Sequence, residues 1–134
     1  MSDTSTQRWR RVEPPRPLNG WERQVLSSIL SAPFESHEGL KAQVEVTRVY
    51  EESPTDPSVM LHVDRGAQTA TAKDGRPWSG IVPFELISRT ADGVPMWALL
   101  DTRDGCLYYL EVQRADGVPL QELPDLAEME LRPL

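Results

Sequence analysis

The fold is decided by residues 84–117, which read FELISRTADGVPMWALLDTRDGCLYYLEVQRADG. Three Asp-Gly pairs, at 92–93, 104–105 and 116–117, divide this stretch into strand-like runs. An Asp-Gly pair at the centre of a two-residue hairpin supplies the positive φ angles that a type I′ turn needs. The stretch therefore predicts consecutive antiparallel strands joined by tight turns, with a less regular segment after the third pair.

Two-residue turns also fix a predicted register. With the turns at 92–93 and 104–105, Leu99 lies opposite both Leu86 and Leu110. One face of the sheet is then nearly all apolar, and we expect it to pack against the helices. Its residues are Phe84, Leu86, Trp97, Leu99, Tyr108, Leu110 and Val112. A slip of one residue would exchange the two faces.

The second predicted face is mixed: Glu85, Ile87, Arg89, Met96, Ala98, Leu100, Tyr109 and Glu111. It is too apolar for a fully solvated surface and too charged for a core, so it needs a cover. Either the irregular loop 64–80 or another protein chain supplies that cover, and the loop offers few apolar side chains. We therefore expect a protein contact on this face, in a homodimer or with a different partner. The candidate binding residues are Ile87, Met96, Leu100, Tyr109 and Trp78.

Two helices are predicted before the sheet. Asn19 and Glu22 form a capping box, and apolar residues at helical spacing follow, so residues 20–31 should be a helix. A shorter helix is expected from Ser36 to about Gln43. Strands are predicted at 44–51 and 59–63, where the apolar period changes to two. The predicted architecture is an α+β fold, with an N-terminal helix and a short second helix packed on an antiparallel meander of four to five strands.

Residues 1–17 are predicted to form an extended Pro-rich arm, since each proline fixes φ and removes a donor. Trp9 is the residue able to anchor this arm, on the domain or on a second copy. Residues 18–134 should form a single α+β domain, because 134 residues suit one core.

Two segments together resemble a known family. The first is Arg16-Pro-Leu-Asn-Gly-Trp-Glu-Arg-Gln-Val-Leu leading to Gly39-Leu-Lys-Ala-Gln-Val; the second combines Ala91-Asp-Gly-Val-Pro-Met, Asp104-Gly105 and Leu110-Glu-Val-Gln-Arg-Ala-Asp-Gly. Over roughly residues 16–120 the chain is similar to a family of small actinobacterial proteins with no assigned activity. The resemblance implies the helical region and the hairpin sheet, and it implies no functional residue.

Composition excludes several classes of function. The net charge of −7 disfavours contact between the folded domain and a phosphate backbone, so no nucleic acid is expected. No apolar run approaches the roughly 18 residues of a membrane helix, so no membrane is expected either. A single cysteine, Cys106, rules out an internal disulfide framework and favours a cytoplasmic protein.

The sequence predicts neither a metal nor a cofactor. His37, His62 and Cys106 are the only soft ligands, and they fall short of the four that a structural zinc site usually takes. Neither a phosphate-binding loop nor a nucleophile elbow occurs.

These observations favour a small acidic, non-catalytic protein-interaction module, of the immunity-like or antitoxin-like kind whose acidity complements basic partners. The alternative is a small-ligand-binding protein or small-molecule enzyme of cystatin-like α+β type. An enclosed cavity with convergent polar groups would favour this alternative, and a filled interior with an exposed apolar patch would favour the interaction module.

Overall fold

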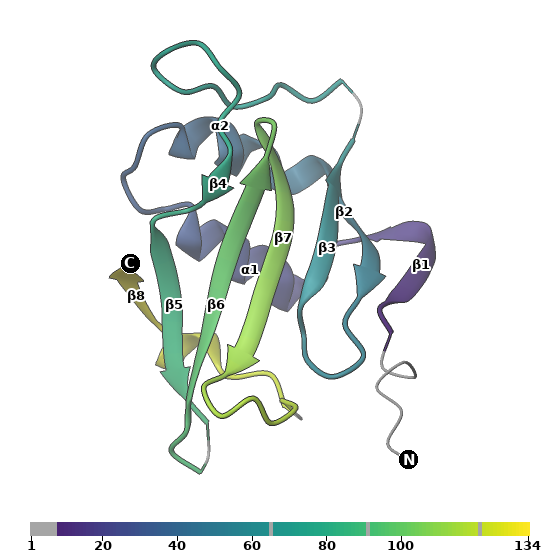
Figure 1. The fold of residues 1–134 in the computed structure, drawn as a ribbon, viewed down its shortest axis with the longest axis vertical. Coiled ribbons are helices and arrows are strands. Elements are labelled where there is room, and N and C mark those ends of the chain that lie inside the picture. Colours follow the sequence, from purple (N-terminus) through teal and green to yellow (C-terminus); the bar gives the residue numbers. More distant parts are fainter. Residues whose placement is uncertain (1–7, 65, 91, 121) are drawn as a thin grey trace.

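The computed structural model describes residues 8–64, 66–90, 92–120 and 122–134, and it shows an antiparallel sheet with two short helices on one face (Figure 1). The helices are α1 (Gly20–Ile29) and α2 (His37–Ala42), and 3₁₀ turns occur at Val44–Val46 and Leu126–Glu128. The strands are β1 (Arg10–Pro17), β2 (Thr47–Glu52), β3 (Val59–Val63), β4 (Gly80–Ile81), β5 (Phe84–Arg89), β6 (Pro95–Arg103), β7 (Cys106–Arg114) and β8 (Glu130–Pro133).

The order of strands across the sheet is β1-β2-β3-β7-β6-β5-β8, and β4 also pairs with β6. The α+β class and the two helices are confirmed, but eight strands replace the predicted four to five. The additional strands β1, β4 and β8 are rich in proline or very short. None of them carries the alternating apolar pattern by which a strand is recognised in a sequence.

The predicted extended arm is partly a strand of this sheet. Arg10 to Pro17 are extended as expected, and they pair with β2 from Arg10 opposite Glu52 to Pro17 opposite Arg48. The register shifts between Arg11 and Arg16, the segment that holds Pro14 and Pro15. Prolines are tolerated there because β1 is an edge strand. Residues 1–7 of the predicted arm lie outside the described residues.

Helix α1 begins at the predicted capping box. The Asn19 side chain accepts a hydrogen bond from the Glu22 backbone N–H at 2.8 Å, and the Glu22 carboxylate accepts one from the Asn19 backbone N–H at 2.9 Å. The Glu22 side chain is buried, and Arg16 compensates its charge with two hydrogen bonds of 2.9 Å. These bonds hold the pKa of Arg16 above its ordinary value. The box therefore fixes both the start of α1 and its connection to β1.

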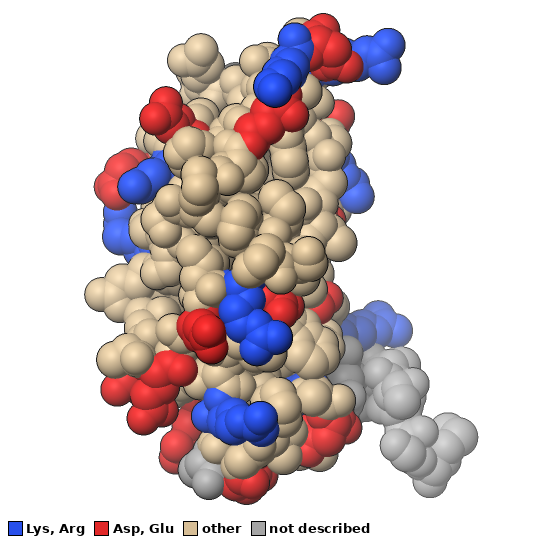
Figure 2. Space-filling view, turned by 90° about the vertical axis from the view of Figure 1, so that its left-hand side faces the viewer, with Lys and Arg blue, Asp and Glu red and all other residues tan. Residues whose placement is uncertain are grey.

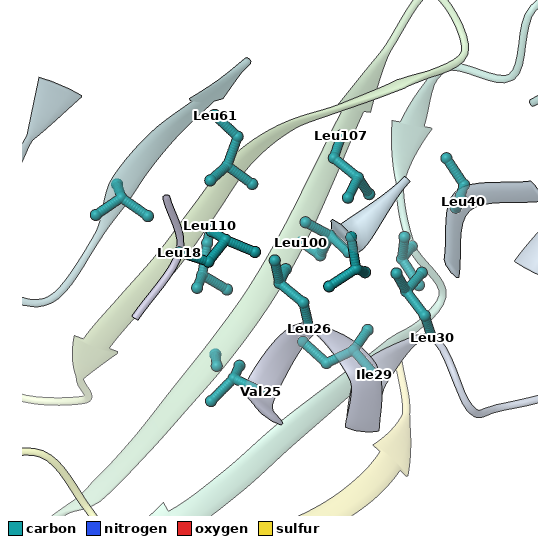
Figure 3. Packing of buried hydrophobic residues seen from close by; sticks show 14 of the residues in the cluster. Leu18, Val25, Leu26, Ile29, Leu30, Leu40, Leu61, Leu100, Leu107 and Leu110 are labelled. Atoms are coloured by element: carbon teal, nitrogen blue, oxygen red, sulfur yellow. The ribbon is translucent and has the colours of Figure 1, made fainter. Parts of the chain in front are cut away.

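The core lies between α1 and the sheet. Leu26 and Ile29 of α1 are fully buried and lie beside Leu100 of β6 (Figure 3). Helix α2 contributes Leu40, which is also fully buried. The interior is thus filled by aliphatic side chains from both layers.

The turn between β6 and β7 is the predicted two-residue turn, but the register beyond it is not the predicted one. Asp104 and Gly105 have φ angles of 52° and 80°, and Arg103 lies opposite Cys106. The register then shifts between Asp101 and Thr102, because β7 carries one extra residue. As a result Leu110 lies opposite Leu100, and the predicted Leu99–Leu110 pair is wrong.

The turn between β5 and β6 is one residue longer than predicted. The Thr90 N–H donates to the Val94 carbonyl at 2.9 Å, so Thr90, and not residue 91, is the partner of Val94 that closes the turn. Residue 91 itself lies outside the described residues. Leu86 consequently lies opposite Ala98, and the predicted Leu86–Leu99 pair is wrong. Relative to the prediction, β6 is therefore displaced by one residue against both of its neighbours, β5 and β7. Its two faces are therefore exchanged relative to the prediction.

Candidate binding face on the open side of the sheet

The side of the sheet opposite α1 and α2, here called the outer face, lies in front of the helices in Figure 1. Directly opposite residues on neighbouring strands share a face, so the register defines its rows. One row runs from Met60 through Tyr109 and Asp101 to Ile81, and another joins Gln113, Trp97 and Ile87. We define the outer-face patch as the apolar and aromatic members of this face: Met60, Ile81, Ile87, Trp97, Leu99 and Tyr109. All six are half-buried except Ile81, which is 55% exposed.

One end of the patch is fixed by an aromatic pair. The rings of Trp9 and Tyr109 meet edge to face, with 5.8 Å between their centroids. Trp9 thus lies against the domain, as one of the two predicted anchoring modes requires, and it remains 37% exposed. Burial raises the pKa of the Tyr109 hydroxyl above its usual value. This hydroxyl therefore stays protonated at neutral pH and can donate a hydrogen bond.

The middle of the patch contains an indole held by a carboxylate. The Trp97 Nε1–H donates to Glu111 Oε2 at 3.2 Å, across β6 and β7. Ile87 lies opposite Trp97 on β5, and Glu111 lies opposite Leu99. The Trp97 ring is therefore fixed in orientation before any partner binds.

A third aromatic contact lies near the turn between β6 and β7. The Arg103 guanidinium stacks over the Tyr108 ring, 4.0 Å from its centroid. Burial, with the nearby Tyr108 and Glu51 adding to it, raises the pKa of Tyr50 on β2. Arg103 is thus engaged within the chain.

Two predicted binding residues, Ile87 and Tyr109, lie in the patch, and their role in binding stays a prediction. Met96 and Leu100 do not lie there: both are fully buried on the helix side, because the faces of β6 are exchanged. Trp78 packs on the core beside Phe34, with 6.0 Å between the ring centroids. The predicted face was therefore wrong at Met96 and Leu100, and the candidate binding residue Trp78 lies against the core instead of in the patch.

Trp97 and Leu99 were predicted to lie in the core, and the structure places them on the outer face. Residues 96–100 read MWALL, so both faces of β6 are apolar and periodicity alone leaves its orientation open. Ile81 was not predicted to lie in a strand, because β4 has only two residues. Met60 follows the ordinary alternation of β3, and that signal could have identified it.

The loop 64–80 does not cover the outer face in its described part. The Ala70 N–H donates to the Gly105 carbonyl at 2.9 Å, and the buried Gln43 side chain donates to the Gln68 carbonyl at 3.0 Å. Gly39 of α2 also approaches Ala70 closely. The loop thus packs against α2 and the turn between β6 and β7. The described part of the loop is therefore not a cover of the outer face, and a cover by another chain stays a prediction.

An open groove of about 1070 Å³ lies between α2 and the loop, where Asp64 and residues 66–71 line it. His37 and Glu38 line it together with Asp64, and the His37 ring Nδ1 lies 2.8 Å from the Phe34 carbonyl oxygen. Burial and Asp104 raise the pKa of the Cys106 thiol, which makes it a weaker nucleophile. Within the described ranges, no three metal-ligating side chains gather at one place.

None of the described helices has the length and apolar character needed to cross a membrane. A comparison with known proteins found no matching protein family, curated sequence or solved structure. The resemblance to the small actinobacterial family therefore stays a prediction, and the roles of individual residues rest on their geometry.

Proposed function

We propose that this chain is a small acidic protein-interaction module without a catalytic role, which binds another protein chain through the outer-face patch. The observation that carries the proposal is that both helices and the described loop residues pack elsewhere, leaving aromatic and aliphatic side chains half-exposed on the central strands. Exposed apolar surface of this kind is typical of protein contacts.

The energetics of the patch favour binding. Each 100 Å² of apolar surface that a partner removes from water contributes about 2.5 kcal/mol, before the cost of association. Part of that cost is the ordering of side chains, and here Trp97 is already held by Glu111 and Tyr109 by Trp9. Less conformational entropy is then lost on binding than for mobile side chains.

The charge distribution agrees with a protein partner. Figure 2 shows charged side chains of both signs scattered over the side of the molecule next to β5, without a broad basic surface of the kind that binds phosphate backbones. We place the module in the cytosol, since its single cysteine cannot form an internal disulfide. An immunity-like or antitoxin-like role is an analogy from size and acidity.

The test substitutes residues of the outer face, the exposed Ile81 and the half-buried Leu99, rather than residues of the buried core. Ile81→Asp and Leu99→Asp introduce a charge into the patch, and Val118→Asp is the matched control because Val118 is 51% exposed in a loop outside it. The readouts are the mass in solution as a function of concentration and the capture of proteins from native lysate.

We expect both patch variants to remain folded and to abolish either self-association or the capture of one particular protein. Val118→Asp should behave like the parent chain. If all three variants match the parent in both readouts, the outer-face patch binds no protein and the proposal is wrong.

A further inference from the structure

We infer that the outer-face patch takes a basic partner, a protein segment that places an arginine or lysine side chain over Trp97 and beside Glu111. This inference rests on the proposed function and names the chemistry of the partner.

The outer face carries an excess of unpaired negative charge. Its carboxylates in the rows around the patch are Glu51, Glu85, Asp101, Glu111 and Glu130. Among the described residues, none of these five forms an ion pair. The acids of the outer face are thus available to a cation from outside.

The arginines around this face are largely engaged within the chain. Arg103 stacks on Tyr108, and Arg48 pairs with Asp64 at 3.3 Å. Arg89 donates to the Gly93 carbonyl at 3.0 Å. Among the described residues, the rows that hold these five acids contain two bases: Arg132, opposite Glu85, and Arg11, opposite Glu51. Arg11 pairs with Glu13 at 3.3 Å. The central rows therefore remain negative at neutral pH.

Trp97 and Glu111 together suit a guanidinium or an ammonium group. The indole ring attracts a cation over its face, and a carboxylate attracts it at close range. Because Trp97 Nε1 and Glu111 Oε2 are 3.2 Å apart, one cation can make both contacts at once. Leu99 opposite Glu111 and Ile87 opposite Trp97 then receive the aliphatic part of the same segment.

A second copy of the chain fits this face less well. In a twofold contact each copy would bring the same excess of acids to the same patch, and like charges across an interface are unfavourable. Neutralising Glu111 separates the two cases by sign. The change weakens the binding of a basic partner, and it strengthens self-association.

The probe is a capped peptide of alternating leucine and arginine, with versions in which glutamine or glutamate replaces arginine. Binding is followed through the indole N–H resonance of Trp97 in the intact chain. Glu111→Gln removes the charge and keeps an oxygen that can accept the Trp97 hydrogen bond, so the ring stays in place. Glu128→Gln, at an exposed acid in the 3₁₀ turn before β8, is the matched control.

We expect the arginine peptide to shift the Trp97 resonance and the other two peptides to leave it unchanged. Glu111→Gln should weaken the affinity about threefold, the loss of one exposed charge contact, and Glu128→Gln should not.

Equal binding of the glutamate peptide, an unchanged affinity in Glu111→Gln, or a higher mass in solution for that variant would overturn the basic-partner inference. So would the failure of the arginine peptide to shift the resonance. The proposed function would still stand in each case if Ile81→Asp abolished self-association or the capture of a protein.

Discussion

A substitution at Gly105 tests whether the loop 64–80 packs against the turn between β6 and β7. Gly105 has a φ angle of +80°, and a Cβ atom added to it would lie 2.7 Å from the Ala70 carbonyl oxygen. Its backbone bonds the loop on both sides: its N–H donates to the Trp78 carbonyl at 2.8 Å, and its carbonyl accepts from the Ala70 N–H at 2.9 Å. The variant Gly105→Ala therefore adds strain and a clash at one point.

The expected loss of stability follows from these contacts. A left-handed alanine costs about 1 kcal/mol relative to glycine. Relieving the clash requires the loop backbone to move, which breaks the two hydrogen bonds at about 1 kcal/mol each. Gly105→Ala should thus lower the free energy of unfolding by about 3 kcal/mol. Gly93 is the matched control, because its φ angle is +85° and nothing lies within 4 Å of an added Cβ. Gly93→Ala should cost about 1 kcal/mol.

Urea unfolding followed by tryptophan fluorescence measures both values. The slope with denaturant should be the same in both variants, so that the midpoints report stability directly. If the two substitutions lower the free energy of unfolding by the same amount, the loop is not docked on the turn between β6 and β7, and the reasoning is refuted.

Gln43→Leu should lower the free energy of unfolding in urea by about 2 kcal/mol, because the buried Leu107 N–H loses the Gln43 side-chain oxygen that accepts its hydrogen bond at 3.0 Å. Amide exchange at Leu107 should also accelerate, and an unchanged exchange rate would contradict this prediction. The Asp92 pKa is lowered to about 2 by the Thr90 hydroxyl and further donors, so its stabilising effect is present above about pH 4 and is lost as the pH falls through 2. Thr90→Val should raise the midpoint of the Asp92 titration followed by NMR, because the Thr90 hydroxyl no longer donates to Asp92. Asn19→Ala should cost about 1 kcal/mol by loss of the cap, measured by thermal unfolding.

The candidate site was predicted only in part. The sheet does have a half-buried face that mixes apolar and charged residues, as predicted, and Ile87 and Tyr109 lie on it. Met96 and Leu100 were misassigned because one extra residue in a turn and one in β7 reverse every side chain of β6. Trp97 and Glu111 form their contact across two strands, and this pair emerges only from the observed register.

The features that the sequence determined by itself are local. The box of Asn19 and Glu22 and the turn at Asp104-Gly105 depend on residues at most three positions apart. Capping and turn formation have the same chemistry wherever such residues stand next to one another. For this reason the start of α1, one hairpin turn and the α+β class could be predicted.

Tertiary structure alone decided the features that join distant segments. Strands β1 and β8 exist because β2 and β5 offer them backbone partners, and their own sequences carry no strand pattern. The orientation of β6, apolar on both faces, is settled by which side α1 covers. In each case the deciding free energy comes from burial and hydrogen bonds between residues far apart in the chain, which no local pattern encodes.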